Sequence, residues 1–84
     1  MAHFARVDGP NGYQIVREVV VVSNTAIGDA PFPQSEALGQ AMLAQSGFHG
    51  QWIQTSYNAS FRGKFAGLGD IWDGHDFIEP PVAP

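Results

Sequence analysis

The sequence predicts an α+β domain, in which an antiparallel sheet of four or five strands carries one three-turn helix on one face. Three observations lead to this fold class. Segments rich in β-branched and aromatic residues alternate with turn signals, one segment has the apolar spacing of an amphipathic helix, and 84 residues leave room for one domain. We therefore expect a single small domain over residues 1–79, followed by a Pro-rich extended tail at residues 80–84.

The first part of the chain predicts a β-hairpin. Residues 3–8 alternate large and small side chains, and the Gly-Pro-Asn-Gly of residues 9–12 is a dense turn signal. Residues 13–23 then contain four successive valines, which favour a strand and, with apolar residues on both faces, suit the middle of a sheet. Because Arg17 and Glu18 interrupt this apolar run, at least one of them should face solvent or occupy a β-bulge.

A loop and the expected helix follow. Prolines on both sides of Phe32 should keep residues 31–33 extended, with Phe32 as an apolar anchor. Ser35 is a good N-cap residue, and Gly47 is a natural stop just after the last turn. The sequence therefore predicts a helix over residues 35–46.

The remaining chain predicts a second strand and a final hairpin. Residues 51–57 are rich in Trp, Ile, Thr and Tyr, whereas residues 61–65 fit either a short edge strand or an irregular loop. At least one of Gly67 and Gly69 should have a positive φ, because this stretch needs unusual backbone angles. Residues 71–78 should form a hairpin across an Asp-Gly type I′ turn.

The expected core lies between the helix and the valine-rich strand. Leu38 and Met42 form the apolar face of the helix that should pack on that strand. We expect the following residues to be largely buried: Phe4, Val19, Val21, Leu38, Met42, Trp52 and Ile53.

Composition narrows the classes of function. Four basic residues against eight acidic ones give a net charge of −4, which makes nucleic acid an unfavourable partner. The chain has no cysteine, which excludes disulfides and thiolate-bound zinc. Because no apolar run approaches the length of a membrane-spanning helix, we expect no membrane contact.

Two groups of residues could carry chemistry, but neither has the required pattern. A carboxylate recurs at every third position, at Asp70, Asp73, Asp76 and Glu79. This spacing differs from the calcium loop of an EF-hand, so solvated turn residues explain it better. A His75-Asp76 pair with Ser56 or Ser60 lacks the strand-to-helix elbow of a serine hydrolase. We therefore expect no catalytic, metal or cofactor site.

The aromatic content indicates an assembly protein. One three-turn helix over a small sheet cannot bury ten aromatic rings, so several should stay exposed or be covered by a partner. The alternation of aromatic and basic residues over 61–65 also occurs in single-strand binders, but the acids that follow cancel its charge. We expect the basic residues to meet acidic groups of a protein partner instead. The candidate partner contacts are Phe32, Arg62, Lys64, Pro80, Pro81 and Pro84.

A family resemblance is carried by segments spread over nearly the whole chain in the same order. These are residues 1–8, 15–24, 31–36, 52–58 with 61–62, 65–69 (Phe-Ala-Gly-Leu-Gly) and 76–78. They resemble a family of small proteins of tailed bacteriophages, especially marine cyanophages, whose members are associated with virus particles and mostly have no assigned role. Phe65, Leu68 and Trp72 stand where that family usually has Tyr, Ile and Tyr.

The resemblance implies a non-enzymatic structural component of a tailed-phage virion. Within the particle we expect a small decoration or cement protein on the capsid, present in multiple copies and contacting other virion proteins, either capsid or tail subunits. The alternatives are a tail or fibre accessory protein and a free phage protein that binds a host protein.

Overall fold

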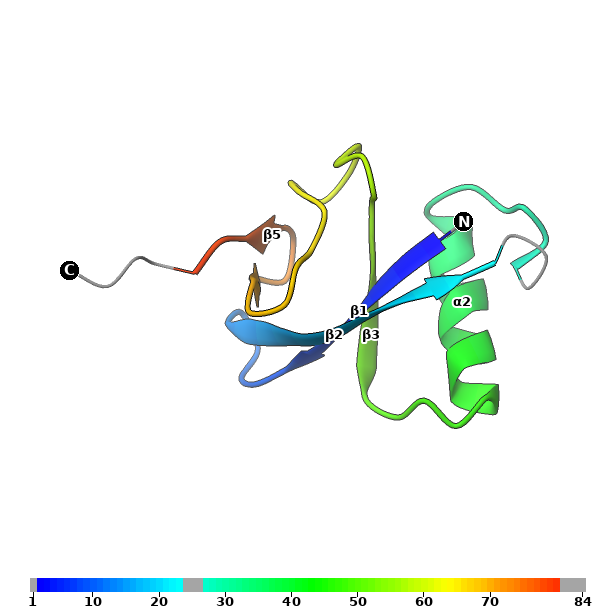
Figure 1. Cartoon of the computed structure of the whole chain (residues 1–84), viewed down its shortest axis with the longest axis horizontal. Coiled ribbons are helices and arrows are strands. Elements are labelled where there is room, and N and C mark those ends of the chain that lie inside the picture. The colour runs from blue at the N-terminus through cyan, green and yellow to red at the C-terminus, as the bar shows by residue number, and fades with distance from the viewer. Residues whose placement is uncertain (1, 24–26, 81–84) are drawn as a thin grey trace.

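The computed structural model describes residues 2–23 and 27–80, which form one antiparallel sheet of five strands and one helix. The elements are β1 (Ala2–Asp8), β2 (Gln14–Val22), α2 (Gln34–Gln45), β3 (Gln51–Thr55), β4 (Ile71–Trp72) and β5 (Phe77–Ile78). The strands lie in the order β3-β1-β2-β4-β5 (Figure 1). The α+β class predicted from the sequence is confirmed.

Strands β1 and β2 form the predicted hairpin, and it contains a β-bulge. Pairing runs from Ala2 opposite Val22 to Arg6 opposite Glu18, after which Val7 pairs with Val16. The register shift leaves Arg17 as the extra residue of β2, with its side chain exposed. The prediction that Arg17 or Glu18 faces solvent or occupies a bulge is therefore confirmed by Arg17.

Strand β2 lies in the middle of the sheet, also as predicted. It pairs with β1 along its length and with β4 at its start, where Ile15 lies opposite Ile71. Its valines are buried unevenly. Val22 is buried and Val19 is half-buried, but Val21 is 53% exposed. The expectation that Val21 belongs to the core was wrong, because this end of the sheet face is only partly covered.

The helix packs on the sheet through a different face from the one predicted. Leu38 is 47% exposed and Met42 is only half-buried, whereas Gly39 and Leu43 are buried. A Cβ atom at Gly39 would lie closer than 3.0 Å to the ring of Phe4, so this glycine lets the ring approach the helix. The predicted packing through Leu38 was therefore wrong, since the smallest residue of the helix faces the largest side chain of β1.

The start of the helix also differs from the prediction. Pro33 occupies the N-cap position with helical backbone angles, and no side chain caps the helix. The hydroxyl of Ser35 instead donates to Oε1 of Gln54 at 2.8 Å. Residues 31–33 form a turn with a cis Phe32–Pro33 peptide rather than the expected extended segment. The contact with β3 therefore replaces the cap expected from the local sequence.

Two groups of buried side chains cover opposite faces of the sheet, because neighbouring residues of a strand point to opposite sides. The group on the helix side contains Ala2, Phe4, Val22, Ile27, Leu43 and Trp52. The group on the other side contains Ala5, Val7, Val16, Ile53, Ala66, Trp72 and Phe77. Figure 1 shows α2 towards one end of the sheet and β4 with β5 towards the other. Burial of Phe4, Trp52 and Ile53 is thus confirmed.

The C-terminal half follows the prediction in outline. Strands β4 and β5 pair as a hairpin, but four residues connect them, and Oδ1 of Asp73 accepts the backbone N–H groups of His75 and Asp76. The expected type I′ turn is not formed, because Asp73 lacks the positive φ that this turn requires. Gly69 has a φ of +87°, which confirms the prediction for this stretch.

Candidate functional site

Arg62 connects distant parts of the molecule from the irregular segment between β3 and β4. Its φ of +58° lies in the left-handed region, and its backbone oxygen accepts the N–H of Phe77 in β5 at 2.9 Å. Its guanidinium donates to both carboxylate oxygens of Glu36, with Nη2 3.0 Å from Oε1. Nη1 also donates to the backbone oxygen of Gln54 in β3 at 3.0 Å. One residue therefore reaches both outer strands of the sheet.

Side chains cover backbone groups on the outer side of strand β3. The N–H of Gln54 donates to Oε2 of Glu36 at 2.9 Å, and its oxygen accepts from Arg62. The oxygen of Trp52 accepts from Nε2 of Gln40 at 2.6 Å. The exposed backbone groups of an edge strand are sites where another strand can pair. These three side chains occupy such positions and so oppose pairing with a second chain.

The electrostatics of the Arg62–Glu36 pair favour the ionised carboxylate. The two side chains are 20% and 19% exposed. Burial raises the pKa of Glu36. The hydrogen bonds from Arg62 and from the backbone of Gln54, together with the positive charge of Arg62, lower this pKa by more than burial raises it. The net result is a pKa below the usual value of 4.5. The pair is therefore ionised at neutral pH.

Aromatic rings surround Arg62 and border a hollow. Its Cζ atom lies 5.0 Å from the ring centroid of Phe32 and 5.1 Å from that of Trp72, within the range of cation–π contacts. Phe32 stacks on Phe61, with ring centroids 3.8 Å apart and planes at 11°. These residues and residues 74–76 of the β4–β5 turn line a hollow of about 350 Å³. The hollow brings together two of the predicted partner contacts, Phe32 and Arg62.

Lys64 takes part in a separate ion pair. Its Nζ lies 2.9 Å from Oδ2 of Asp70 and 3.6 Å from Oε1 of Glu79. The hydrogen bond to Asp70 is the main reason why the pKa of Lys64 is raised. The same Asp70 oxygen accepts the backbone N–H of Gly67 at 2.7 Å. Both basic residues predicted to meet an acidic partner therefore already have acidic partners within this chain.

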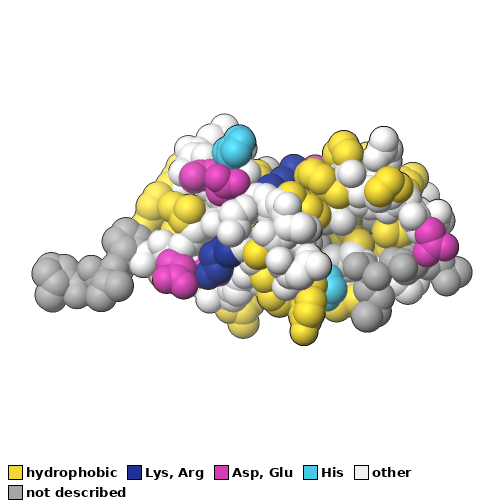
Figure 2. All heavy atoms as spheres, turned by 90° about the horizontal axis from the view of Figure 1, so that it is seen from above, with side chains coloured by type: hydrophobic (Ala, Val, Ile, Leu, Met, Phe, Trp, Pro, Cys, Tyr) yellow, Lys and Arg dark blue, Asp and Glu magenta, His cyan; other side chains and the backbone are white. Residues whose placement is uncertain are grey.

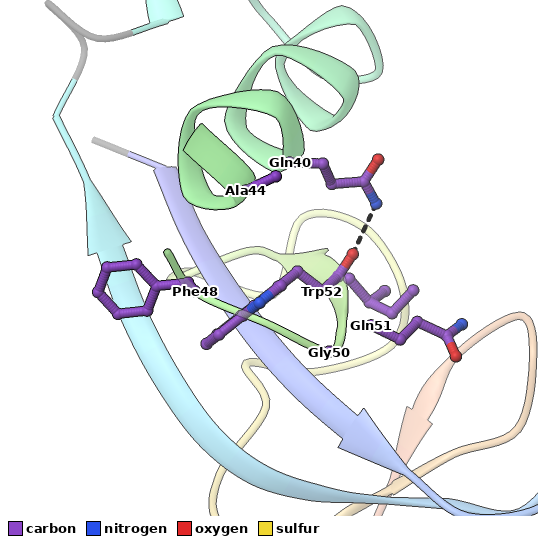
Figure 3. A pocket seen from close by; sticks show the side chains of 7 residues that line it. Gln40, Ala44, Phe48, Gly50, Gln51 and Trp52 are labelled. Atoms are coloured by element: carbon purple, nitrogen blue, oxygen red, sulfur yellow. Dashed lines mark hydrogen bonds between the residues drawn. The ribbon is translucent and has the colours of Figure 1, made fainter. Parts of the chain in front are cut away.

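A second hollow, of about 250 Å³, lies between α2 and β3 (Figure 3). Gln40 and Ala44 of the helix line one side, and Phe48 and Trp52 line another. The ring of Phe48 lies edge-on to Trp52 at a centroid distance of 6.0 Å. The indole N–H of Trp52 is buried without a hydrogen-bond partner in the described part of the chain. The Gln40 hydrogen bond to the backbone of Trp52 spans this hollow and joins helix to strand (Figure 3).

A group of three aromatic rings lies on the other face of the sheet. The His3 ring stacks on the ring of Tyr57 at a centroid distance of 5.4 Å and meets the ring of Phe65 edge-on at 5.3 Å. Val21 of β2 lies opposite His3 of β1 in the sheet. Tyr57 is 72% exposed. Burial is the main cause that lowers the pKa of His3, which favours its neutral form. We call His3, Tyr57, Phe65 and Val21 the aromatic patch.

Large apolar side chains reach solvent at several further places. In the view of Figure 2, hydrophobic atoms appear at separate points of the surface among polar ones. Among the described residues, the large hydrophobic side chains that are exposed are Tyr13, Val21, Leu38, Phe48, Tyr57, Leu68 and Ile78. This agrees with the expectation that so small a fold cannot bury all its aromatic rings.

The serine and histidine candidates from the sequence do not come together as a catalytic triad in the described residues. Ser56 and Ser60 hydrogen-bond to each other at 2.8 Å, and His75 pairs with Asp76 at 3.1 Å on the exposed β4–β5 turn. Within residues 2–23 and 27–80, no three histidine or acidic side chains gather in a way that could hold a metal ion. Of the predicted tail contacts, Pro80 is exposed, and Pro81 and Pro84 lie outside the described residues.

Sequence reasoning missed three members of the Arg62 site. Glu36 was not predicted to be a partner of Arg62, 26 positions away, with which it forms an ion pair. Phe61 and Trp72 were not singled out as parts of this site. The only available signal was the alternation of aromatic and basic residues over 61–65, which indicates neither the partner carboxylate nor the stacking on Phe32.

The chain matches no protein-family model, no curated protein sequence and no solved structure. In the described part of the chain, no helix combines the length and the hydrophobicity needed to cross a membrane.

Proposed function

We propose that this chain is a non-enzymatic structural protein of a tailed-phage virion, located in the particle as a small decoration protein on the capsid. The observation that carries the proposal is the exposed apolar surface, above all Tyr57 at 72% and Leu68 at 74% exposure. A contiguous group of apolar side chains at the surface of a small protein is typical of a site that a partner covers, and Tyr57 belongs to such a group with His3 and Phe65. The resemblance of segments 52–58 and 65–69 to phage proteins supports the virion as the place of that partner.

The aromatic patch supports an attachment role for this surface. The lowered pKa of His3, caused mainly by burial, favours the neutral imidazole and so reduces the cost of covering this ring. Tyr57 combines a large apolar area with a polar hydroxyl, a residue type enriched in interfaces. A partner subunit that covers the patch would bury apolar area with little electrostatic cost.

A protein inventory of purified virions by mass spectrometry tests the proposal. The expected result is that the protein is present at a fixed, high copy number together with the capsid protein. If it is found in infected-cell lysate but is lost on purification of particles, it is a free phage protein and the proposal is wrong. Recovery at low copy number with isolated tails would overturn the capsid assignment in favour of a tail or fibre accessory.

Variants of the patch test the surface itself. Tyr57→Ser should lower the copy number per virion by about twofold or more, because exposed aromatic anchors contribute strongly to interfaces. Tyr13→Ser is the matched control, since Tyr13 is also exposed but lies by the β1–β2 turn. If the two variants enter particles equally well, the aromatic patch is not the attachment surface.

A further inference from the structure

The hollow beside Arg62 joins an aromatic wall to an acidic turn. Phe32 and Phe61 line one part of it, and Asp76 lines another. Its volume of about 350 Å³ falls at the small end of the range for ligand pockets, about 300–1,000 Å³. The hollow is therefore large enough to receive a single side chain of a partner.

The charges around this hollow sum to a negative value. Arg62 and Glu36 neutralise each other through their ion pair. The β4–β5 turn then adds the half-buried carboxylate of Asp76, which lines the hollow and whose Oδ2 is 3.1 Å from Nδ1 of the exposed His75. The exposed carboxylate of Asp73 belongs to the same turn but does not line the hollow. The backbone N–H groups of Asp76 and His75 lower the pKa of Asp73, so this group is ionised at neutral pH. Figure 2 shows acidic side chains next to a histidine side chain on the face in view.

The aromatic rings that line the hollow, like the acidic turn, favour a cation over an anion. The face of an aromatic ring carries negative potential and attracts cations. Phe32 and Trp72 already contact one guanidinium, that of Arg62, at 5.0 and 5.1 Å. A second cation in the hollow would be attracted by the Asp76 carboxylate and by any ring face that Arg62 and the Phe32–Phe61 stack leave open, whereas an anion would be repelled by Asp76.

We propose that this hollow binds a lysine or arginine side chain of the virion subunit to which the protein attaches. The inference rests on the proposed function and names the chemistry of its partner. It reverses the charge expected from the sequence, where Arg62 and Lys64 were to meet acidic groups. The reversal follows because both cations have carboxylate partners within the chain, whereas the exposed Asp73 and the half-buried Asp76 have no lysine or arginine partner among the ion pairs of the described residues.

An NMR titration of the full-length, ¹⁵N-labelled protein tests the proposal with small probes. N-acetyl-arginine amide and N-acetyl-lysine amide should shift the backbone signal of Gly74 and the indole signal of Trp72 in a saturable way. N-acetyl-glutamine amide, the neutral probe, should shift them less. In the Asp73→Asn/Asp76→Asn variant, affinity for the cationic probes should fall about fivefold, because two exposed charge interactions are lost.

Asparagine keeps the hydrogen-bond acceptor that Asp73 provides to the turn, so the variant should retain the fold. Asp8→Asn is the matched control, because it removes an exposed carboxylate beside a different turn. This control should change probe affinity by no more than about twofold. If an N-acetyl-glutamate amide probe binds more tightly than the cationic probes, or if the double variant binds them as the wild type does, the proposal is wrong.

Incorporation into particles separates this inference from the proposed function. If the wild-type protein is found in virions and the Asp73→Asn/Asp76→Asn variant enters them at the same copy number, the cation site is overturned and the virion role stands. If the wild-type protein is absent from virions, the proposed function is overturned, and probe binding alone then decides whether the hollow prefers cations.

Discussion

Replacement of Arg62 by methionine would test how strongly its guanidinium stabilises the contact of its segment with α2 and β3. Methionine keeps an unbranched apolar stem but removes the hydrogen bonds to Glu36 and to the backbone oxygen of Gln54. The carboxylate of Glu36, 19% exposed, would then lie partly buried without its cation. Breaking a buried pair by removing one partner costs about 3–5 kcal/mol. Since a fifth of each side chain still meets water, we expect about 3 kcal/mol.

This loss is large for a domain of this size. At about 0.05–0.15 kcal/mol per residue, 84 residues correspond to a free energy of unfolding of roughly 4–13 kcal/mol. Urea denaturation at pH 7, followed by tryptophan fluorescence, would measure the difference. The matched control is Arg6→Met, which breaks the more exposed Arg6–Glu18 pair, 3.1 Å long, and should cost less than about 1 kcal/mol. If Arg62→Met costs no more than Arg6→Met, the role assigned to Arg62 is wrong.

The pH dependence of the free energy of unfolding, compared between the wild type and Arg62→Met, tests the same explanation. In the wild type the pKa of Glu36 is lower in the folded state than its ordinary value of 4.5. Its contribution to stability is therefore present above about pH 4.5 and is lost as the pH falls through the folded-state pKa. In Arg62→Met the buried carboxylate loses its cation, which raises its pKa, so acidification should remove the penalty instead. A wild-type and a variant that lose stability in parallel below pH 5 would contradict this explanation.

The remaining predictions concern the face of the helix that packs on the sheet. Gly39→Ala should destabilise the fold by about 1–3 kcal/mol in thermal or urea unfolding, although alanine normally favours a helix by about 1 kcal/mol, because its Cβ would overlap the ring of Phe4. The cost should shrink in a Phe4→Leu background, and an additive result would refute the clash. Leu43→Ala should cost about 2–5 kcal/mol, since Leu43 is buried. Leu38→Ala should cost no more than about 1 kcal/mol, because Leu38 is half exposed. Equal losses of stability at the two leucines would contradict the packing of the helix through Leu43.

Local sequence features predicted most of the strands and the helix in their order along the chain. The Gly-Pro-Asn-Gly turn and the valine run predicted the first hairpin and its central strand, because turn chemistry and β-branching act over a few neighbouring residues. The break in the apolar run predicted that Arg17 or Glu18 would face solvent or occupy a bulge, and Arg17 does both. The positive φ of Gly69 followed from a local need for backbone freedom. The α+β class is the sum of these short-range preferences.

The packing face of the helix was decided only in the tertiary structure. Apolar spacing favoured Leu38, because a leucine contributes more to an amphipathic pattern than a glycine does. In the fold Gly39 faces the sheet, since the Phe4 ring needs the space that a Cβ would occupy. Ser35 likewise does not cap the helix, and its hydroxyl donates a hydrogen bond to the side chain of Gln54 in β3 instead. Complementary shape between two elements cannot be inferred from the periodicity of either one.

The candidate site depended on the tertiary structure to a still greater degree. The segment around Arg62 was recognised by its alternating aromatic and basic residues, and Phe32 by its flanking prolines. Their meeting, with Glu36 as the counter-ion, joins residues 26 positions apart through an ion pair and stacked rings. Residue types show which charges and rings a chain possesses. Which charges neutralise each other, and which remain for a partner, is set by distances that exist only once the chain has folded.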